Sequence, residues 1–202
     1  MRIKFAIKRS NKTFSKKNLK YHAQAWGDIT SDKEVLETIS GLPIPVDKLP
    51  RRHWEVHPVN LKDNERISEE IEKLLQKGVI VQCEHELGEC ISPVFLTPKS
   101  DGCFRFFLNL KGLNSFIEKK RFKMQTLSSI LCMIRPNMYM AKLDIKDAYY
   151  SIPIKALHQK YLKFKHNGKL YKYVVLPNGY TEGPRKFTKT MKPPLAKLRK
   201  DV

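Results

Sequence analysis

The chain has 202 residues, 41% of them hydrophobic, which is enough for one core and too little for several domains. It contains no apolar run of about 18 residues, so the sequence predicts no membrane-spanning helix. The sequence has 39 Lys and Arg residues but only 20 Asp and Glu residues. The resulting formal net charge of +19 makes a polyanion such as a nucleic acid the expected partner.

The basic residues gather at the two ends of the chain. Residues 1–22 carry eight Lys or Arg and no acid, which is typical of a solvated or disordered basic arm. A mitochondrial presequence is the alternative for this arm, but the segment lacks a clean amphipathic period. Residues 155–202 carry thirteen Lys or Arg and only two acids.

The four cysteines are irregularly spaced, which favours reduced thiols in an intracellular protein, cytoplasmic or nuclear. Cys83, His85 and Cys90 lie close together in the stretch CEHELGEC and could hold zinc. Their spacing matches no common structural zinc site, and a fourth ligand is not evident. Free thiols are therefore the prediction.

Residues 23–64 are expected to form a helix and a proline-rich lead-in. The helix is predicted over residues 30–41, with Thr30, Ser31 or Asp32 as the N-cap. The proline-rich stretch that follows, up to residue 60, is predicted to be an extended connector.

The stretch ISEEIEKLLQKG predicts the next helix. Ser68 is its expected N-cap, and Lys77 and Gly78 are expected at its end. The residues expected to face the core are Ile71, Leu74 and Leu75. The stretch VIVQC then predicts a strand.

Two turn signals predict two β-hairpins. The first turn is KSDG, residues 99–102, and the second is the Asn167–Gly168 dipeptide between alternating apolar runs. We expect His158 and His166 to be exposed and without a chemical role.

The remaining elements complete an α+β pattern. A helix is predicted in TLSSILCMI before Pro136, a strand in MYMAKLDI, and a helix from Pro184 that carries Arg185, Lys186 and Lys189. Strands and helices mix irregularly without a repeated βαβ unit, which favours a mixed or antiparallel sheet packed by helices. Neither a G-x-G-x-x-G fingerprint nor a Walker loop occurs.

Two acids follow the strand predicted in MYMAKLDI. Asp144 ends the apolar stretch, and Asp147 comes three residues later, before Tyr149 and Tyr150. Carboxylates at a strand end suit hard cations such as Mg²⁺, and a pair of such ions can activate a 3′-hydroxyl and steady a pyrophosphate leaving group. The same spacing also occurs where an Asp caps a turn, and the two tyrosines could instead fill a core.

Three blocks of the sequence together resemble the motifs of a known protein family. PVFLTPKSDGCFRFFLNLKGLN, KLDIKDAYYSIPI and LPNGYTEGPRKFTK resemble, in order and spacing, the fingers and palm motifs of reverse transcriptases from retroviruses and retrotransposons. The resemblance assigns residues 65–202 to right-hand polymerase fingers and an incomplete palm. The upstream AWGDITSDKEVLETISG is similar to the lead-in of retrotransposons that carry a tyrosine recombinase, with LTR elements as the other similar group.

The second block implies the catalytic centre. By resemblance, Asp144 is a catalytic residue that binds Mg²⁺ or Mn²⁺, with the Ile145 carbonyl as a further metal ligand. Asp147, Ala148 and Tyr149 match the pocket for the sugar and triphosphate of the dNTP, where the tyrosine ring acts as a steric gate against a 2′-hydroxyl.

The other two blocks imply further contacts with the substrates. Lys99 and Arg105 resemble the residues that hold the dNTP triphosphate, and Lys111 resembles a basic residue that contacts the template. Asn178 and Gly179 fall where the family's loop touches the incoming nucleotide. Retroviral enzymes usually have Gln at the position of Asn178.

One part of the family's site has no counterpart in the sequence. The family completes its metal site with a Tyr-x-Asp-Asp hairpin, and this chain contains no Asp-Asp pair. We therefore expect a fragment of an RNA-directed DNA polymerase, without the downstream palm, thumb and RNase H regions and weak or inactive alone. Its expected partners are an RNA or DNA template-primer and dNTP, with no membrane. The alternative is a non-catalytic nucleic-acid-binding module derived from a retroelement.

Overall fold

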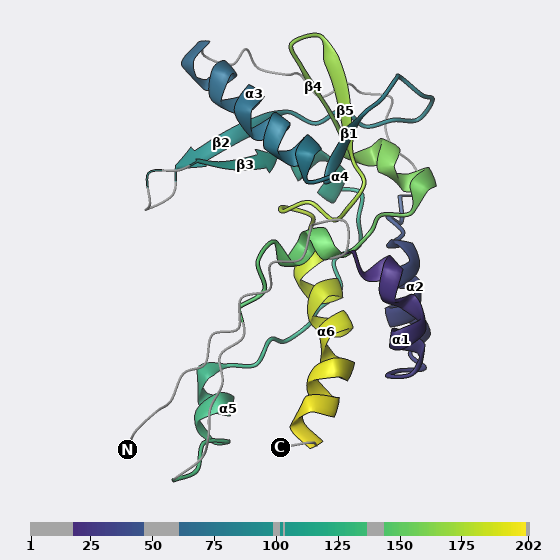
Figure 1. Cartoon of the computed structure of the whole chain (residues 1–202), viewed down its shortest axis with the longest axis vertical. Helices are drawn as coiled ribbons and strands as arrows, with labels where there is room; N and C mark the ends of the chain where they lie inside the picture. The colour runs from purple at the N-terminus through teal and green to yellow at the C-terminus, as the bar shows by residue number, and fades with distance from the viewer. Residues whose placement is uncertain (1–17, 47–60, 99–101, 103, 137–143, 201–202) are drawn as a thin grey trace.

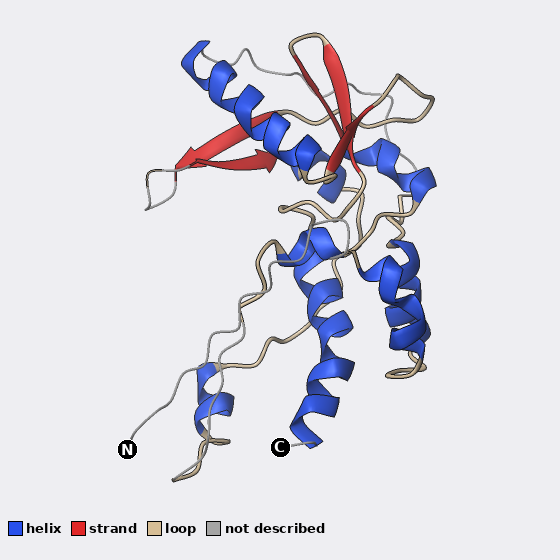
Figure 2. Cartoon of the chain, in the orientation of Figure 1, coloured by secondary structure: helices blue, strands red, loops and turns tan. Residues whose placement is uncertain are grey.

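The computed structural model describes residues 18–46, 61–98, 102, 104–136 and 144–200. Helices and antiparallel strands are combined irregularly (Figures 1 and 2), which confirms the predicted α+β class. The elements in chain order are the 3₁₀ helix η2 (Leu19–His22), α1 (Ala23–Gly27), α2 (Lys33–Gly41), α3 (Leu61–Gln76), β1 (Ile80–Gln82), β2 (Val94–Pro98), β3 (Phe104–Leu108), α4 (Lys111–Asn114), α5 (Leu127–Leu131), the 3₁₀ helices η3 (Ala148–Ser151) and η4 (Ala156–Leu162), β4 (Lys163–His166), β5 (Lys169–Tyr173) and α6 (Gly183–Lys200).

The strands form two antiparallel sheets, one with the order β1–β5–β4 and one made of β2 and β3. Both predicted hairpins are confirmed as strand pairs. In the β4–β5 turn, Asn167 has a φ of 47° and Gly168 a φ of 76°. Two successive residues at positive φ match the right-handed twist of the flanking strands, which is why an Asn–Gly pair is favoured there.

Helix α3 begins earlier than predicted. It starts at Leu61, so Ser68 lies inside the helix, and the prediction that Ser68 is the N-cap is wrong. The Ser68 hydroxyl instead donates to the Asn64 carbonyl at 3.0 Å. The helix extends back because Ile67 continues its buried stripe, whereas Leu75, predicted to face the core, is 39% exposed.

Both histidines predicted to be exposed are partly or fully buried, so that prediction is wrong. His166 is buried, and its Nε2 lies 2.8 Å from Ser68 Oγ. Because Ser68 gives its proton to a carbonyl, the ring nitrogen is the donor in this pair. His158 Nδ1 accepts a hydrogen bond from the Ile44 amide at 2.8 Å. Burial lowers the pKa of both rings, so each is favoured as a neutral hydrogen-bonding group.

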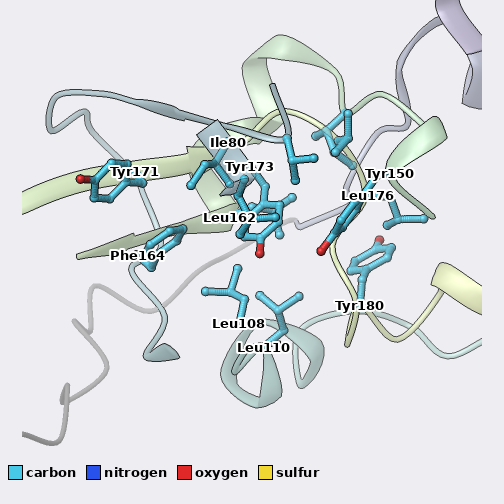
Figure 3. Close-up of a cluster of buried hydrophobic side chains, with 14 of the residues drawn as sticks. Ile80, Leu108, Leu110, Tyr150, Leu162, Phe164, Tyr171, Tyr173, Leu176 and Tyr180 are labelled. Carbon is cyan, nitrogen blue, oxygen red and sulfur yellow. The ribbon is translucent and has the colours of Figure 1, made fainter. Parts of the chain in front are cut away.

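The main core lies between the two sheets and the end of α3. Tyr173 and Phe164 are among its largest fully buried side chains, and Phe164 stacks on Tyr171 with ring centroids 5.4 Å apart. Figure 3 shows Tyr150 in the same cluster, with Tyr180 near it, and Leu108 of β3 belongs to the cluster as well. Burial raises the pKa of Tyr150 to about 12, so its hydroxyl stays protonated.

A smaller core joins the N-terminal helices to α6. Trp26, Val35 and Ile39 are buried together and pack against Met191, and α2 and α6 stand side by side in Figure 1. Of the three residues predicted as possible N-caps of α2, Asp32 is the cap, because its Oδ1 accepts a hydrogen bond from the Glu34 amide at 2.9 Å. The helix predicted from Pro184 is also confirmed. It is α6, which begins one residue before Pro184, at Gly183.

Helix α5 is the most exposed element of the described chain. It is shorter than predicted and ends at Leu131, before Pro136, and Figure 1 shows it apart from the sheets. The strand predicted in MYMAKLDI falls mostly outside the described residues, and its last two, Asp144 and Ile145, have no regular secondary structure. Within the described ranges, every helix falls short of the length and apolar character that a membrane span requires.

Candidate active site

A cavity of about 390 Å³ opens where the end of α3, strand β3 and helix η3 meet. We call it the central cavity. Its walls come from four parts of the chain that are far apart in sequence. The lining residues are Glu70, Leu74, Lys77, Phe104, Arg105, Phe106, Asp147, Ala148, Tyr149, Tyr150 and Asn178.

A turn at Asp147 borders the central cavity. This residue has φ 56° and ψ 40°, a left-handed conformation that Asp adopts more readily than most non-glycine residues. The Tyr150 amide donates to the Asp147 carbonyl at 3.0 Å and starts the turn of η3. The Asp147 carboxylate pairs with Lys77 Nζ at 3.2 Å. This ion pair joins the turn to the end of α3.

Tyr149 forms a wall of the central cavity and is braced by α6. Its ring meets the Phe187 ring edge-on, with centroids 5.5 Å apart and an interplanar angle of 73°. Burial raises the pKa of Tyr149, so the hydroxyl is protonated at neutral pH. The aromatic wall therefore depends on where α6 lies.

The loop that carries Asn178 is anchored to α4. Gly179 has φ 97°, and a Cβ placed on it would lie 3.4 Å from the Leu108 carbonyl oxygen. The Gly179 carbonyl accepts from Asn114 Nδ2 at 2.8 Å, and Asn114 Oδ1 accepts from the Thr181 amide at 3.0 Å. A glycine at this position thus permits both the left-handed backbone and the close approach to β3.

Five of the site residues expected from the sequence line the central cavity together. They are Arg105, Asp147, Ala148, Tyr149 and Asn178. They come from the three sequence blocks that carried the resemblance, and folding brings those blocks to one place.

The other expected site residues lie elsewhere. Asp144 and Ile145 are exposed on the segment that leads into the Asp147 turn, and Gly179 follows Asn178 in its loop. Lys111 is exposed at the first position of α4. Lys99 lies outside the described residues.

The three basic residues at the start of α6 are bound to an acid of α2. Glu34 Oε1 lies 3.0 Å from Arg185 Nη2 and 2.8 Å from Lys186 Nζ, and Glu34 Oε2 pairs with Lys189. Hydrogen bonds from Lys186 and Lys189, with a smaller contribution from Arg185, lower the pKa of Glu34 to about 2. Arg185 also pairs with the buried Glu182. This ion-pair network fixes α6, and hence Phe187, against α2.

Sequence reasoning missed the ion pairs that Lys77 and Glu34 form. Lys77 was expected only as a cation near a helix end, and Glu34 only as part of a helix. No local signal pairs either residue with its partner, because Lys77 and Asp147 are 70 positions apart and Glu34 and Arg185 are 151 positions apart.

Known proteins resemble this chain in sequence. The transposon Tf2-3 and Tf2-7 polyproteins of Schizosaccharomyces pombe are each 25% identical to it over 164 residues, which is 78% of this chain and 12% of the polyprotein. The chain therefore spans about an eighth of the length of these relatives.

Solved structures resemble the fold. The native prototype foamy virus protease-reverse transcriptase has a TM-score of 0.63 and 23% identity, covering 95% of this chain and 28% of that one. A CSH mutant of that protein has a TM-score of 0.61 and 27% identity, covering 74% of this chain and 20% of that one. A foamy viral protease-reverse transcriptase in complex with dsDNA has a TM-score of 0.62 and 19% identity, covering 94% of this chain and 43% of that one.

The family comparison agrees with the geometry. The model of the family described as reverse transcriptase (RNA-dependent DNA polymerase) matches residues 97–202, more than half of the chain. This range includes the segments that contribute Arg105, Tyr149 and Asn178 to the central cavity. The chain belongs to the reverse transcriptase family.

Proposed function

We propose that this chain forms the nucleotide-selecting part of an RNA-directed DNA polymerase, which transfers a nucleotide from dNTP to a primer 3′-hydroxyl. The observation that carries the proposal is the convergence of Arg105, Asp147, Ala148, Tyr149 and Asn178 on one cavity. A cavity with aromatic walls and a few charged groups suits a nucleotide, which has an apolar base and an anionic tail.

Each part of the dNTP has an assigned contact in this proposal. Arg105, with Lys99, holds the triphosphate, and its guanidinium is suited to grip phosphate oxygens in pairs. Asp147 and Ala148 border the sugar, and Tyr149 stands against its 2′ position. Because Phe187 braces the Tyr149 ring, the ring resists displacement by an extra hydroxyl.

The loop and α4 complete the proposed substrate contacts. Asn178 and Gly179 touch the incoming nucleotide, and Lys111 contacts the template backbone. Lys111 is exposed, so its ammonium is free to reach a phosphate of a bound strand.

The proposed metal site is Asp144 together with the Ile145 carbonyl. Both are hard oxygen donors, and Mg²⁺ commonly binds one or two carboxylates together with substrate phosphates, so the donor set fits Mg²⁺ or Mn²⁺. When bound, such an ion lowers the pKa of the 3′-hydroxyl and stabilises the pyrophosphate leaving group. Across the described residues, no cluster of three or more His, Cys, Asp or Glu side chains is placed to hold a metal. In this proposal, the further carboxylates for the metal come from the Tyr-x-Asp-Asp hairpin that the family resemblance implies.

The test of this function is primer extension. Because the chain spans 12% of the transposon polyproteins, extension is measured with the longest product of its reading frame that contains these residues. We expect Mg²⁺-dependent synthesis on a primer-template, and we expect Asp144→Asn to abolish it. A variant that extends primers as fast as the unmodified protein would show that Asp144 does not bind the catalytic metal.

The proposed steric gate has a separate test. Replacing Tyr149 with Ala should let ribonucleotides be incorporated, because the wall opposite the 2′ position is removed. Phe187→Ala, which removes the brace and keeps the wall, should relax sugar selection less. Unchanged discrimination between dNTP and rNTP in the Tyr149→Ala protein would assign selection to another residue.

A non-catalytic nucleic-acid-binding module is the second candidate function, and the net charge of +19 favours it. Binding through phosphate contacts weakens steeply with salt, since counterions are released. This candidate predicts salt-sensitive binding of the chain to primer-template that survives Asp144→Asn, with no extension by any longer product. Absence of binding at low salt would exclude it.

A further inference from the structure

The central cavity contains a cation that none of the roles proposed above uses. Lys77 follows the last residue of α3, and its ammonium crosses to Asp147 at 3.2 Å. The helix ends there because Gly78 turns the backbone to φ 65°. The end of α3 thus places Lys77 in the lining of the cavity, where its side chain is 39% exposed.

The two acids that line the central cavity are Glu70 and Asp147, and each has its own cation. Glu70 pairs with Lys73 at 2.7 Å, and Asp147 pairs with Lys77 at 3.2 Å. Without Lys77, a triphosphate in the cavity would meet the Asp147 carboxylate with its paired cation removed. The effect is strong in a partly enclosed site, where charges are less screened than in open water.

The geometry of the ammonium also leaves it able to bind substrate. A lysine ammonium has three N–H donors, and the Asp147 carboxylate at 3.2 Å takes one of them. Because Lys77 lines the cavity, a phosphate oxygen of a bound nucleotide can accept from the remaining donors. The same ion pair joins α3 to the turn at Asp147, and η3 with Tyr149 follows directly in the chain.

We infer that Lys77 is a further nucleotide-binding residue, which neutralises Asp147 and donates to the triphosphate of the bound nucleotide. This inference rests on the proposed function. It links helix α3 directly to the reacting end of the substrate. The alternative role of Lys77 is structural, as a cation near the negative end of the helix dipole.

The test is a fluorescence titration of the 202-residue chain with a labelled 2′-deoxynucleoside triphosphate in Mg²⁺. We expect Lys77→Met to weaken binding about tenfold, which corresponds to the loss of one charge-assisted hydrogen bond. Lys77→Arg should recover most of the affinity. The matched control is Lys165→Met, which removes an exposed lysine of β4 outside the cavity lining and should stay within about twofold of the unmodified chain.

Two further comparisons separate binding from a structural role. The loss caused by Lys77→Met should be smaller for the labelled monophosphate than for the triphosphate, because fewer anionic oxygens are present. Adding Asp147→Asn to Lys77→Met should restore part of the triphosphate affinity, because the unpaired acid is then removed. A structural role would instead weaken both nucleotides equally, lower the melting temperature, and gain nothing from the second change.

The outcomes distinguish this inference from the proposed function. If Arg105→Met weakens triphosphate binding and Lys77→Met leaves it within twofold of the unmodified chain, the role of Lys77 is refuted while the nucleotide pocket stands. If the unmodified chain shows no saturable triphosphate binding, the proposed function and the role of Lys77 both fail.

Discussion

Replacing Glu34 with Gln tests whether the ion pairs between α2 and α6 stabilise the protein. The Glu34 carboxylate contacts three cations, with Arg185 Nη2 at 3.0 Å and Lys186 Nζ at 2.8 Å. A solvent-exposed pair contributes about 0.2–1 kcal/mol, and the Glu34 side chain is 32% exposed. Losing three such pairs on one partly buried acid should therefore lower the free energy of unfolding by about 1–2 kcal/mol.

The assay is urea unfolding followed by circular dichroism at low and high salt. Urea is uncharged, so ionic strength can be varied independently of the denaturant. At low salt we expect a lower urea midpoint with an unchanged slope, and a melting temperature lower by about 2–6 °C. At about 1 M salt the screening length falls to about 3 Å, so the difference between the two proteins should shrink.

The matched control is Glu37→Gln, which makes the same charge change at an exposed position of α2. Its effect should stay within about 0.5 kcal/mol, as for most surface substitutions. If Glu34→Gln and Glu37→Gln unfold alike at low salt, the network does not stabilise α6, and the reasoning is refuted.

Three further predictions address the fold. Acid should destabilise the protein between about pH 4.5 and 2, because folding lowers the pKa values of Glu34 and Glu89 from 4.5 to about 2. As the pH falls through this range, the unfolded chain takes up protons first, so the stability present above pH 4.5 is lost. A urea midpoint that does not change across this range would contradict the prediction. Gly168→Ala should cost about 1 kcal/mol in thermal unfolding because φ there is +76°, and an unchanged melting temperature would show that the turn adapts. Ile39→Ala, at a fully buried position of the smaller core, should cost about 2–5 kcal/mol, and a loss below about 1 kcal/mol would mean that this core is not needed for stability.

The predicted elements that proved correct depend on neighbouring residues alone. The Asn167–Gly168 turn follows from two residues that tolerate positive φ, and the Asp32 cap follows from a side chain that reaches its own helix's amides. The errors arose where distant parts of the chain compete with local signals. Ser68 is a good cap by type, but packing of Ile67 carried α3 past it. His166 looked exposed beside a turn, but α3 covers it and Ser68 binds it.

The sequence by itself determined the α+β class, the two hairpins and the order of the three blocks, because turn chemistry and hydrophobic periodicity act over a few residues. Only the tertiary structure decided which residues face each other across the central cavity. Lys77 meets Asp147 because α3 ends beside η3, and Glu34 meets Arg185 because α2 packs on α6. A charged residue has the same local signature whether or not an opposite charge reaches it through folding, so these pairings depend on how the elements pack.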